Sequence, residues 1–272
     1  MKQRIGAIIV THNSDEVIHK CVDSIQQQSH PVDEIIIVDS GSNDLGYLDS
    51  INEQSRVKVI ETDNIGFGRC NNLGIKYLDR QIDIVVFLNP DTFLFPNFFE
   101  KMIEKFLSHG DVGILSGKLL CYDLQKKGPD GRIDSCGIFR KWYGRWYDRG
   151  QGAVDVGQYD TKKYVPALCG ALLCCRVRVL RQFSGVLFDP DFFMYKEDVE
   201  LGIRMRKLGH KLLYHPELIA YHCRGWQKSR KKMALEIKKI ASLNEILLYK
   251  KHPSPYLLWA LFKYSLVSVF KI

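Results

Sequence analysis

The first 90 residues alternate short apolar runs with helical patterns, and this alternation is the feature that most restricts the fold. The apolar runs are rich in Val and Ile, as in strands buried on both faces, and they cover residues 5–10, 34–38, 57–61 and 84–88. Between the first two runs, residues 15–25 place apolar side chains at helical spacing behind an acidic start. Strands that alternate with helices predict a parallel sheet with right-handed crossovers. We therefore expect an α/β fold with a mostly parallel central sheet flanked by helices.

A polar turn follows each of these strands at its carboxyl end. The polar residues and glycines of interest are Thr11 and Asn13 after the first strand, Asp39 after the second, Asn64 and Gly66 after the third, and Asn89 and Asp91 after the fourth. Parallel strands bring their carboxyl ends to one edge of a sheet, and ligands of open α/β sheets bind at that edge. We therefore expect these residues to share one ligand site.

Two carboxylates at this edge admit both a chemical and an ordinary interpretation. Asp91 stands on a Pro-stiffened turn and can offer oxygen to a hard divalent cation. Asp39, near Thr11, can accept the imide hydrogen of uracil or thymine, a donor that cytosine lacks. Asn, Pro and Asp are also common in plain turns, and Asp39 could equally cap a turn or a helix. The residues alone leave both interpretations open.

The turn after the third strand is rich in glycine without being a dinucleotide fingerprint. A G-x-G-x-x-G motif follows the first strand of a dinucleotide fold, whereas residues 66–71 follow the third strand and end in Asn71. Gly66 more simply allows a tight strand-to-helix turn, or the close approach of a ligand to the backbone.

The second half of the chain is less regular. Apolar patterns predict helices over 98–107 and 199–208, and strands over 112–120, 212–214 and 219–222. The segment 121–166 is punctuated by glycines and carries aromatic and basic side chains, which favours mixed hairpins or an ordered flap over the site. No regular sheet pattern is expected there.

Two further places in this half are candidates for the site. Gly170 and Ala171 interrupt the apolar run 165–175, where a ligand could approach the backbone closely. Glu197 and Asp198 stand at the start of the predicted helix, where a carboxylate could serve as a base. Acids are also favoured at helix starts by the helix dipole alone.

The cysteines and the charge bear on where the chain works. Eight cysteines are scattered without a C-x-x-C pair, so neither a zinc site nor a disulfide framework is indicated, and we expect reduced, mostly buried thiols. No apolar leader with a cleavage site precedes the first strand, which predicts a cytoplasmic protein. Residues 224–272 hold eleven Lys or Arg and two acidic residues, whereas the first 223 hold 28 and 29. A basic tail on a near-neutral body indicates an acidic partner, either anionic lipid or nucleic acid.

Seven segments, taken in order, resemble the family 2 glycosyltransferases, whose fold is called GT-A. The segments are Ile8–Ser14, Val38–Asp44, Asn64–Gly74, Phe87–Asp91, Cys169–Ala171, Phe192–Leu201 and His222. The resemblance implies a GT-A domain over residues 1–225 with a Rossmann-like nucleotide-binding half. It also implies transfer of a sugar from a nucleoside-diphosphate sugar, such as dTDP-rhamnose or a UDP-hexose, to a glycan or lipid-linked acceptor in cell-surface polysaccharide synthesis.

The same resemblance implies roles for residues of this chain. The nucleotide would be bound by Thr11, Asn13, Asp39, Asn64, Gly66, Asn89 and Asp91, with Gly170 and Ala171 in the acceptor or donor-sugar loop. Asp91 stands at the last position of the D-x-D signature and would bind Mg²⁺ or Mn²⁺ with the donor diphosphate, and His222 would be a further metal ligand. Asp198, with Glu197 beside it, would be the general base.

One residue departs from the family pattern. Asn89 replaces the first Asp of the D-x-D signature, which lowers the negative charge of the site, and the Asn-x-Asp form resembles rhamnosyltransferase-like members. The chemistry suits the remaining residues, because a cation at the phosphate and a carboxylate at the acceptor hydroxyl are what displacement of a nucleoside diphosphate requires. One base and no covalent nucleophile imply inversion at the anomeric carbon.

Two other classes compete with this interpretation. A non-catalytic protein could bind nucleic acid or a membrane with its basic tail, but the chain has no nucleic-acid recognition motif and its body is near neutral, so we expect no nucleic-acid partner. A sugar nucleotidyltransferase would share the sheet and the metal Asp, but residues 11–16 lack the Gly-rich basic phosphate loop it would carry.

The tail, residues 226–272, lies outside the resemblance. Its apolar residues Met233, Ile237, Ile240, Leu243 and Leu247 recur at helical spacing among lysines, which predicts a basic amphipathic helix over 230–250. Residues 256–270 are apolar and aromatic but too short to span about 30 Å of hydrocarbon. We expect the tail either to hold the protein on the cytoplasmic face of an anionic membrane or to pack on the catalytic domain or on another subunit in a homo-oligomer.

Overall fold

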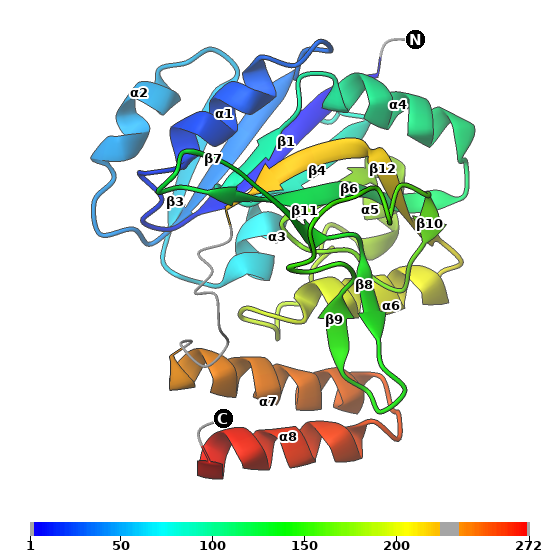
Figure 1. Ribbon diagram of the computed structural model, residues 1–272. Helices are drawn as coiled ribbons and strands as arrows, with labels where there is room; N and C mark the ends of the chain where they lie inside the picture. The colour runs from blue at the N-terminus through cyan, green and yellow to red at the C-terminus, as the bar shows by residue number, and fades with distance from the viewer. Residues whose placement is uncertain (1–2, 224–233, 271–272) are drawn as a thin grey trace.

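The computed structural model describes residues 3–223 and 234–270 (Figure 1). The first part contains β1 Ile5–Thr11, α1 Ile18–Gln26, β2 Glu34–Ser40, the 3-10 turn Gly46–Leu48, α2 Asp49–Asn52, β3 Val57–Thr62, α3 Phe67–Tyr77 and β4 Ile84–Leu88. The second contains β5 Thr92–Leu94, α4 Phe98–Ser108, β6 Val112–Asp123, β7 Gly128–Ser135, β8 Ile138–Arg140, β9 Trp146–Asp148, β10 Lys163–Tyr164 and β11 Leu172–Arg176. The last contains α5 Val177–Leu180, the 3-10 turn Arg181–Phe183, α6 Glu197–Lys207, β12 Lys211–His222, α7 Leu235–Lys251 and α8 Leu257–Phe270.

A single large sheet organises residues 3–223. Its strand order is β10-β12-β6-β11-β4-β1-β2-β3, with β5 paired to β12 and β7 to β6. The strands β3, β2, β1 and β4 are parallel, as the alternation in the sequence predicts. In the other half, β11 is antiparallel to both β4 and β6, and β6 and β12 are again parallel. The α/β class is confirmed, with a parallel first half and a mixed second half.

Helices cover both faces of this sheet (Figure 1). On β1 the side chains of Ile5 and Ile9 face one layer, which contains α1 and α4, whereas Ile8 faces the layer of α3 and α6. This period of two within a strand that is buried throughout requires apolar residues at every position, and the sequence supplies them.

Two local predictions differ from the structure. Helix α1 begins at Ile18, not at the acidic pair, because Val17 before it has a non-helical φ of −127°. The two short C-terminal strands are one strand, β12. In the apolar run 165–175, strand β11 begins at Leu172, whose N–H donates to the carbonyl of Cys169 and so closes a turn.

The glycine-rich segment 121–166 forms hairpins, as predicted. Strand β7 folds back on β6, and β8 and β9 make a separate two-stranded hairpin. That hairpin extends away from the sheet toward the connection between α7 and α8 (Figure 1). The ring of Tyr143 at its tip packs edge-on against Trp259 of α8, with ring centroids 4.8 Å apart. Aromatic residues of this segment therefore join the tail to the rest of the molecule.

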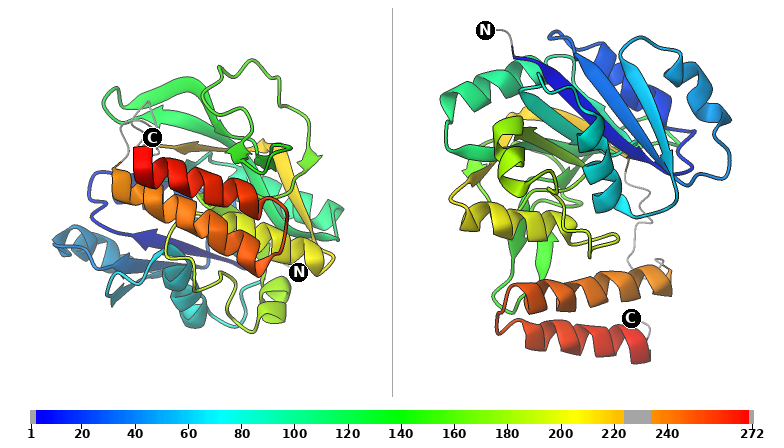
Figure 2. Two further views of the ribbon diagram at one scale, coloured as in Figure 1. Left: turned by 90° about the horizontal axis from the view of Figure 1, so that it is seen from below. Right: turned by 180° about the vertical axis from the view of Figure 1, so that it is seen from behind.

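The tail folds into two helices, and the buried face of the first is not the predicted one. Helices α7 and α8 lie side by side across one end of the molecule (Figure 2). Leu243 of α7 is 46% exposed, whereas the polar residues Ser242, Asn244 and Glu245 are buried. The prediction from apolar spacing is wrong here because Asn244 bonds to the carbonyl of Met194 and Glu245 bonds to Lys263 of α8, whereas the Ser242 hydroxyl bonds within α7. Met233 and the lysines before it lie outside the described residues.

The expectation of reduced, mostly buried cysteines is confirmed. All eight cysteines are free thiols, and six of them are buried. Burial raises the pKa of Cys21, Cys174 and Cys175, which keeps these thiols protonated. Within the described parts of the chain, none of the helices has the length and hydrophobicity needed to cross a bilayer.

A bulge in β12 depends on one glycine of β6. His215 pairs with Gly117 and Ile219 pairs with Lys118, so the residues 216–218 have no partner in this ladder. A Cβ atom built on Gly117 would lie 1.9 Å from the carbonyl oxygen of Leu218. The bulge therefore fits only against a residue without a side chain.

We predict that Gly117→Ala destabilises the fold, because the new methyl group meets a backbone carbonyl that cannot move without breaking the bulge. The expected loss is about 1–3 kcal/mol in the free energy of unfolding. Urea unfolding followed by circular dichroism measures it. The control is Gly110→Ala, since a Cβ at Gly110 meets nothing within 4 Å. Equal stability of the two variants would show that the bulge has other means of support.

Candidate active site

The predicted base-binding residues lie together at the ends of two neighbouring strands. Thr11 on β1 is paired in register with Asp39 on β2, and both side chains are buried. The hydroxyl of Tyr47 lies 3.1 Å from Thr11 Oγ1 and donates to Asp39 Oδ2 at 3.0 Å. Asp39 Oδ1 also accepts the N–H of Ser42 at 2.8 Å. The carboxylate is thus held rigidly at the sheet edge, where it retains capacity for one more donor.

The other residues predicted near the nucleotide have mainly structural contacts. Asn13 has a φ of +48°, and its side-chain oxygen accepts the N–H of Asn43, so it joins the loops after β1 and β2. Asn64 accepts a hydrogen bond from Ser40 at 3.3 Å. Gly66 has a φ of +91°, and a Cβ there would lie 2.5 Å from the carbonyl oxygen of Phe193. The glycine therefore allows another segment of this chain to come close, and it forms the strand-to-helix turn.

The predicted metal residues form a cluster around His222. The Nε2 atom of His222 lies 3.3 Å from Asp91 Oδ1 and 3.4 Å from the side-chain nitrogen Nδ2 of Asn89. Its Nδ1 atom lies 2.8 Å from Asp134 Oδ2, and both His222 and Asp134 are buried. Strand β12 brings His222 here by pairing with β5, which directly follows Asp91. Asn89, Asp91 and His222 are therefore neighbours, as the sequence predicts.

The electrostatics of this cluster depend on two carboxylates. Burial alone lowers the pKa of His222, but the charge of Asp91 and the hydrogen bond with Asp134 outweigh burial and raise the pKa to about 9. Without a cation, His222 is thus an imidazolium at neutral pH, and it must release a proton before its Nε2 atom can ligate a metal. Asp134 fixes Nδ1 as the atom that keeps its hydrogen, which leaves Nε2 facing Asp91.

The donor set fits a divalent cation that shares its ligands with a substrate. In the described residues, 3–223 and 234–270, no group of three His, Cys, Asp or Glu is placed to hold a metal alone. Asp91 and His222 supply one oxygen and one nitrogen that lie 3.3 Å apart. Cations such as Mg²⁺ commonly take only one or two protein carboxylates and complete their shell with phosphate oxygens and water. The pair is therefore suited to a cation that arrives with a diphosphate.

The turn at Gly170 and Ala171 connects this cluster to the predicted base. The carbonyl of Ala171 accepts the N–H of Asn89 at 3.0 Å and the hydroxyl of Thr92 at 3.2 Å. The N–H of Gly170 donates to Asp198 Oδ2 at 3.2 Å. The pairing of β11 with β4 sets this turn beside the end of β4. Both parts of the predicted site thus touch one turn.

Glu197 and Asp198 occupy the first turn of α6, and their surroundings differ. Burial raises the pKa of both carboxyls, and burial together with the charge of Asp198 raises that of Glu197 to about 8. Asp198 is partly exposed and accepts N–H bonds from Gly170 and Val199. Glu197 is buried, and its Oε2 atom has no hydrogen-bond partner. The proton of the pair therefore belongs on Glu197, and the charge on Asp198.

Two residues of the site carry no signal in the sequence. Asp134 lies on β7, in the glycine-rich segment, 88 residues from the histidine that it contacts. Tyr47 precedes the short helix α2 and reaches both Thr11 and Asp39 with its hydroxyl. Neither stands at the end of a predicted strand. Only pairing across the sheet could have pointed to Asp134.

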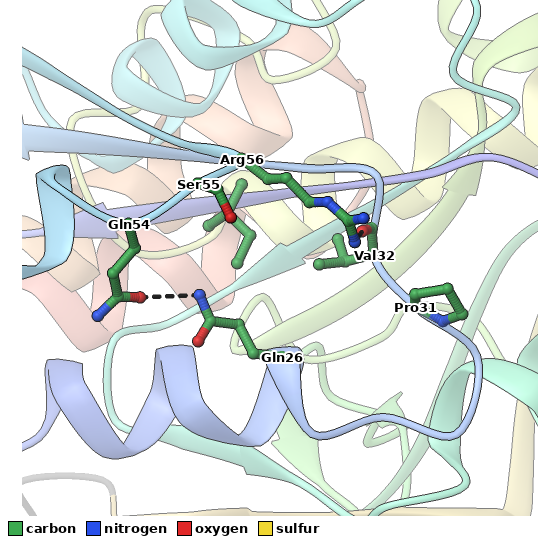
Figure 3. A pocket seen from close by; sticks show the side chains of 7 residues that line it. Gln26, Pro31, Val32, Gln54, Ser55 and Arg56 are labelled. Carbon is green, nitrogen blue, oxygen red and sulfur yellow. Dashed lines mark hydrogen bonds between the residues drawn. The ribbon is translucent and has the colours of Figure 1, made fainter.

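One pocket of the described structure lies away from these residues. A pocket of about 430 Å³ is bounded by Gln26, Pro31, Val32, Ile35, Gln54, Ser55 and Arg56 (Figure 3). Gln26 donates to Gln54 across it. These residues lie at the amino ends of β2 and β3, on the opposite edge of the sheet from Asp39. The pocket contains none of the predicted site residues.

Relatives with similar sequences include two rhamnosyltransferases. The chain is 22% identical over 229 residues to the O-antigen chain rhamnosyltransferase RfbN of Salmonella typhimurium. The aligned region covers 82% of this chain and 67% of that protein. It is 23% identical over 252 residues to the N-acetylglucosaminyl-diphospho-decaprenol L-rhamnosyltransferase of Mycobacterium tuberculosis. This aligned region covers 85% of this chain and 79% of that protein. An uncharacterized glycosyltransferase of Haemophilus influenzae is 24% identical over 234 residues, covering 83% and 67%.

Solved structures of low sequence identity share the fold. The structure of GalNAc-T7 with UDP, GalNAc and Mn²⁺ matches with a TM-score of 0.69 and 15% identity, over 98% of this chain and 58% of that one. The mannosyltransferase from Pyrobaculum calidifontis in complex with GDP-Man and Mn²⁺ matches with a TM-score of 0.62 and 16% identity, over 99% and 71%. These matches, together with the mixed sheet, confirm the predicted GT-A fold.

A family-level comparison covers the first half of the chain. The profile of the family described as "Glycosyl transferase family 2" matches residues 7–148, which is just over half of the chain. The matched segment includes Thr11, Asp39 and Asp91, whereas Gly170, Asp198 and His222 lie beyond it. The strand-end residues, the fold and the relatives thus agree, and the chain belongs to the family 2 glycosyltransferases.

Proposed function

We propose that this glycosyltransferase moves a sugar from a nucleoside-diphosphate donor to an acceptor hydroxyl with inversion at the anomeric carbon. The observation that carries the proposal is the turn at Gly170 and Ala171, which contacts Asp198 on one side and the loop of Asp91 on the other. A base and a phosphate-binding group on two sides of one turn suit a displacement in which nucleophile and leaving group lie on opposite sides of the sugar.

Asp198 is the general base in this proposal. The acceptor O–H gives its proton to Asp198 while its oxygen forms the new bond to the anomeric carbon. The bond from that carbon to the diphosphate oxygen breaks, and its electrons leave with the nucleoside diphosphate. Asp198 is suited to this step because it is partly exposed and carries the negative charge of the pair, whereas Glu197 is buried and holds the proton.

Asp91 and His222 are proposed to hold Mg²⁺ or Mn²⁺ together with the donor diphosphate. The bound cation would stabilise the negative charge that develops on the leaving phosphate. Asp134 holds His222 by its Nδ1 atom, so that Nε2 stays directed at Asp91. Asn89 adds no charge, and its backbone N–H fixes the loop to Ala171.

For the donor we propose dTDP-rhamnose first and a UDP-hexose second. Thr11 and Asp39 would contact a uracil or thymine, and Asn13, Asn64 and Gly66 shape the loops around them. The choice of rhamnose rests on the two rhamnosyltransferases among the relatives. The M. tuberculosis relative is named for a lipid diphosphate acceptor, which supports a lipid-linked acceptor for this chain in cell-surface polysaccharide synthesis.

A lipid-linked acceptor agrees with a location on the cytoplasmic face of a membrane, and we propose that α8 provides the contact. Four apolar residues on the outer face of α8 are exposed: Leu258, Leu261, Phe262 and Val269. Trp142, at the tip of the β8–β9 hairpin that packs on α8, is 85% exposed and lies between the exposed cations Lys141 and Arg145. Apolar side chains beside basic ones, with an exposed Trp, suit the interface of an anionic bilayer.

Our prediction for the base is that Asp198→Asn lowers the rate of transfer by about 10² to 10⁴-fold while donor binding survives, since an amide cannot accept the proton. Release of nucleoside diphosphate and calorimetric binding of the donor measure the two effects. In the unmodified enzyme the rate should fall as pH is lowered through the raised pKa of Asp198, because the protonated carboxyl is not a base.

Glu197→Gln is the matched control for this prediction, because an amide at position 197 keeps the size and neutrality of the protonated carboxyl. It should retain more than a tenth of the rate. If Asp198→Asn is the variant that stays active and Glu197→Gln is not, the base is Glu197.

Removal of the metal carboxylate should act on donor binding. We predict that Asp91→Ala abolishes the part of donor affinity that depends on Mn²⁺, because a diphosphate would then meet the site without its cation. Asn89→Asp should be tolerated, since it restores the usual first Asp of the family signature. Titration of the donor with and without Mn²⁺ tests both. An unchanged metal dependence in Asp91→Ala would show that Asp91 is not a ligand.

The full chain should float with vesicles that contain anionic lipid at low salt, and less with neutral vesicles or at high salt. Replacing Trp142, Leu258 and Phe262 together by Ser should abolish flotation. Leu107→Ser is the control, because Leu107 is 72% exposed on α4, away from α8. A full chain that stays at the bottom of the gradient contradicts the membrane role. Sedimentation that shows the triple variant losing a dimer instead would assign the α8 face to a second copy.

A further inference from the structure

The turn that precedes Glu197 and Asp198 has an unfavourable backbone. Tyr195 and Lys196 have φ angles of +72° and +75°, and neither is glycine. Two consecutive residues in the left-handed region are strained, and such a conformation persists only where the surroundings determine it. Lys196 is also the cap residue of α6, and no side chain caps this helix. The direction in which α6 presents its first two carboxyls therefore depends on what holds this turn.

The tail holds it. Asn244 of α7 is buried, and its side-chain amide nitrogen donates to the carbonyl of Met194 at 2.8 Å and to that of Tyr195 at 3.0 Å. Both hydrogens of one amide thus go to the backbone of the strained turn, 49 and 50 residues away in sequence. From the other side, the carbonyl of Phe193 accepts the N–H of Phe67 at 2.9 Å. The turn lies between α3 and α7.

Further contacts join the end of α7 to the same region. Lys251 forms ion pairs with Asp189 and Asp191, at 2.7 and 2.6 Å, in the loop that leads into the turn. His252 lies 3.0 Å from a carboxylate oxygen of Glu200, one turn along α6 from the catalytic pair. These contacts place the end of α7 beside the loop and the helix that flank the strained turn, and the Asn244 side chain bonds to the backbone of the turn itself.

We propose that Asn244 is a positioning residue for the base, and that its two hydrogen bonds hold the turn 194–196 so that Asp198 faces the acceptor. The inference rests on the proposed role of Asp198. It makes the C-terminal helices a working part of the active site, in addition to any contact that α8 makes with a membrane. Asn244 acts through the backbone and does not touch the substrate.

The first test measures the turn itself. Hydrogen exchange of the full chain, read by mass spectrometry, should show faster exchange over residues 195–201 in Asn244→Ala, since the N–H of Glu200 that donates to Lys196 loses its support. The control is Tyr249→Phe, also on α7, where the hydroxyl accepts from Trp146 and donates to the carbonyl of Gly144. That variant weakens the packing of α7 without touching the turn, so exchange over 195–201 should stay as in the unmodified chain.

The second test measures catalysis with dTDP-rhamnose or UDP-glucose as the donor and with an acceptor or water as the nucleophile. Release of the nucleoside diphosphate gives the rate. Asn244→Ala should lower kcat about tenfold or more and leave the KM for the donor within about twofold, whereas Tyr249→Phe should leave both unchanged. The low-pH limb of kcat should also move to lower pH in Asn244→Ala, because a loosened turn admits water to the carboxyl whose pKa burial raises. The other charges acting on Asp198 are Lys196 and Asp148 of β9, and both remain.

The outcomes separate this inference from the proposed function. Unchanged exchange over 195–201 in Asn244→Ala overturns the positioning role, whatever the activity. So does faster exchange with kcat and the pH profile unchanged. If the turn loosens as expected but Asp198→Asn keeps full activity, the assignment of Asp198 as base fails, and Asn244 is then a residue that supports the fold of α6 alone.

Discussion

The antiparallel pairing of β11 with β4 is the constraint on which the site depends. It is the point where the parallel half of the sheet meets the mixed half, and it sets the turn of Gly170 and Ala171 against the end of β4. The turn then makes hydrogen bonds to the loop of Asn89 and to Asp198, which come from opposite halves of the chain. A change in this register by one residue would reverse the faces of β11 and separate the two carboxylate groups.

The sequence allows the nucleotide-binding half to be predicted because its signals are local. A strand that is apolar throughout and ends in polar residues places those residues at the sheet edge, so Thr11, Asp39 and Asp91 lie where the alternation of strands and helices predicts. Asp134 could not be found in this way. It lies on a strand without apolar periodicity, and its relation to His222 exists only through the sheet.

In the tail, the sequence predicts the helix but not which of its faces is buried. Apolar spacing predicts helix α7 correctly, but it assigns the wrong buried face, since Ser242, Asn244 and Glu245 are buried through polar contacts. A helical pattern counts apolar residues and has no means of recognising an amide that bonds to two carbonyls of another segment. The same holds for Tyr195 and Lys196, whose left-handed backbone costs about 1–3 kcal/mol each and leaves no trace in the sequence.

Glu245 follows Asn244 in α7 and is buried against Lys263 of α8, with which it forms an ion pair. The second tail helix is thereby connected to the residue next to Asn244, which bonds to the turn before α6. Linkage between two sites is reciprocal, so whatever a ligand on α8 does to the affinity of this turn for an acceptor, the acceptor does to the affinity of α8 for that ligand in the same degree. If α8 contacts a membrane as proposed, and if that contact steadies the turn, membrane and acceptor would each lengthen the residence of the other on the enzyme.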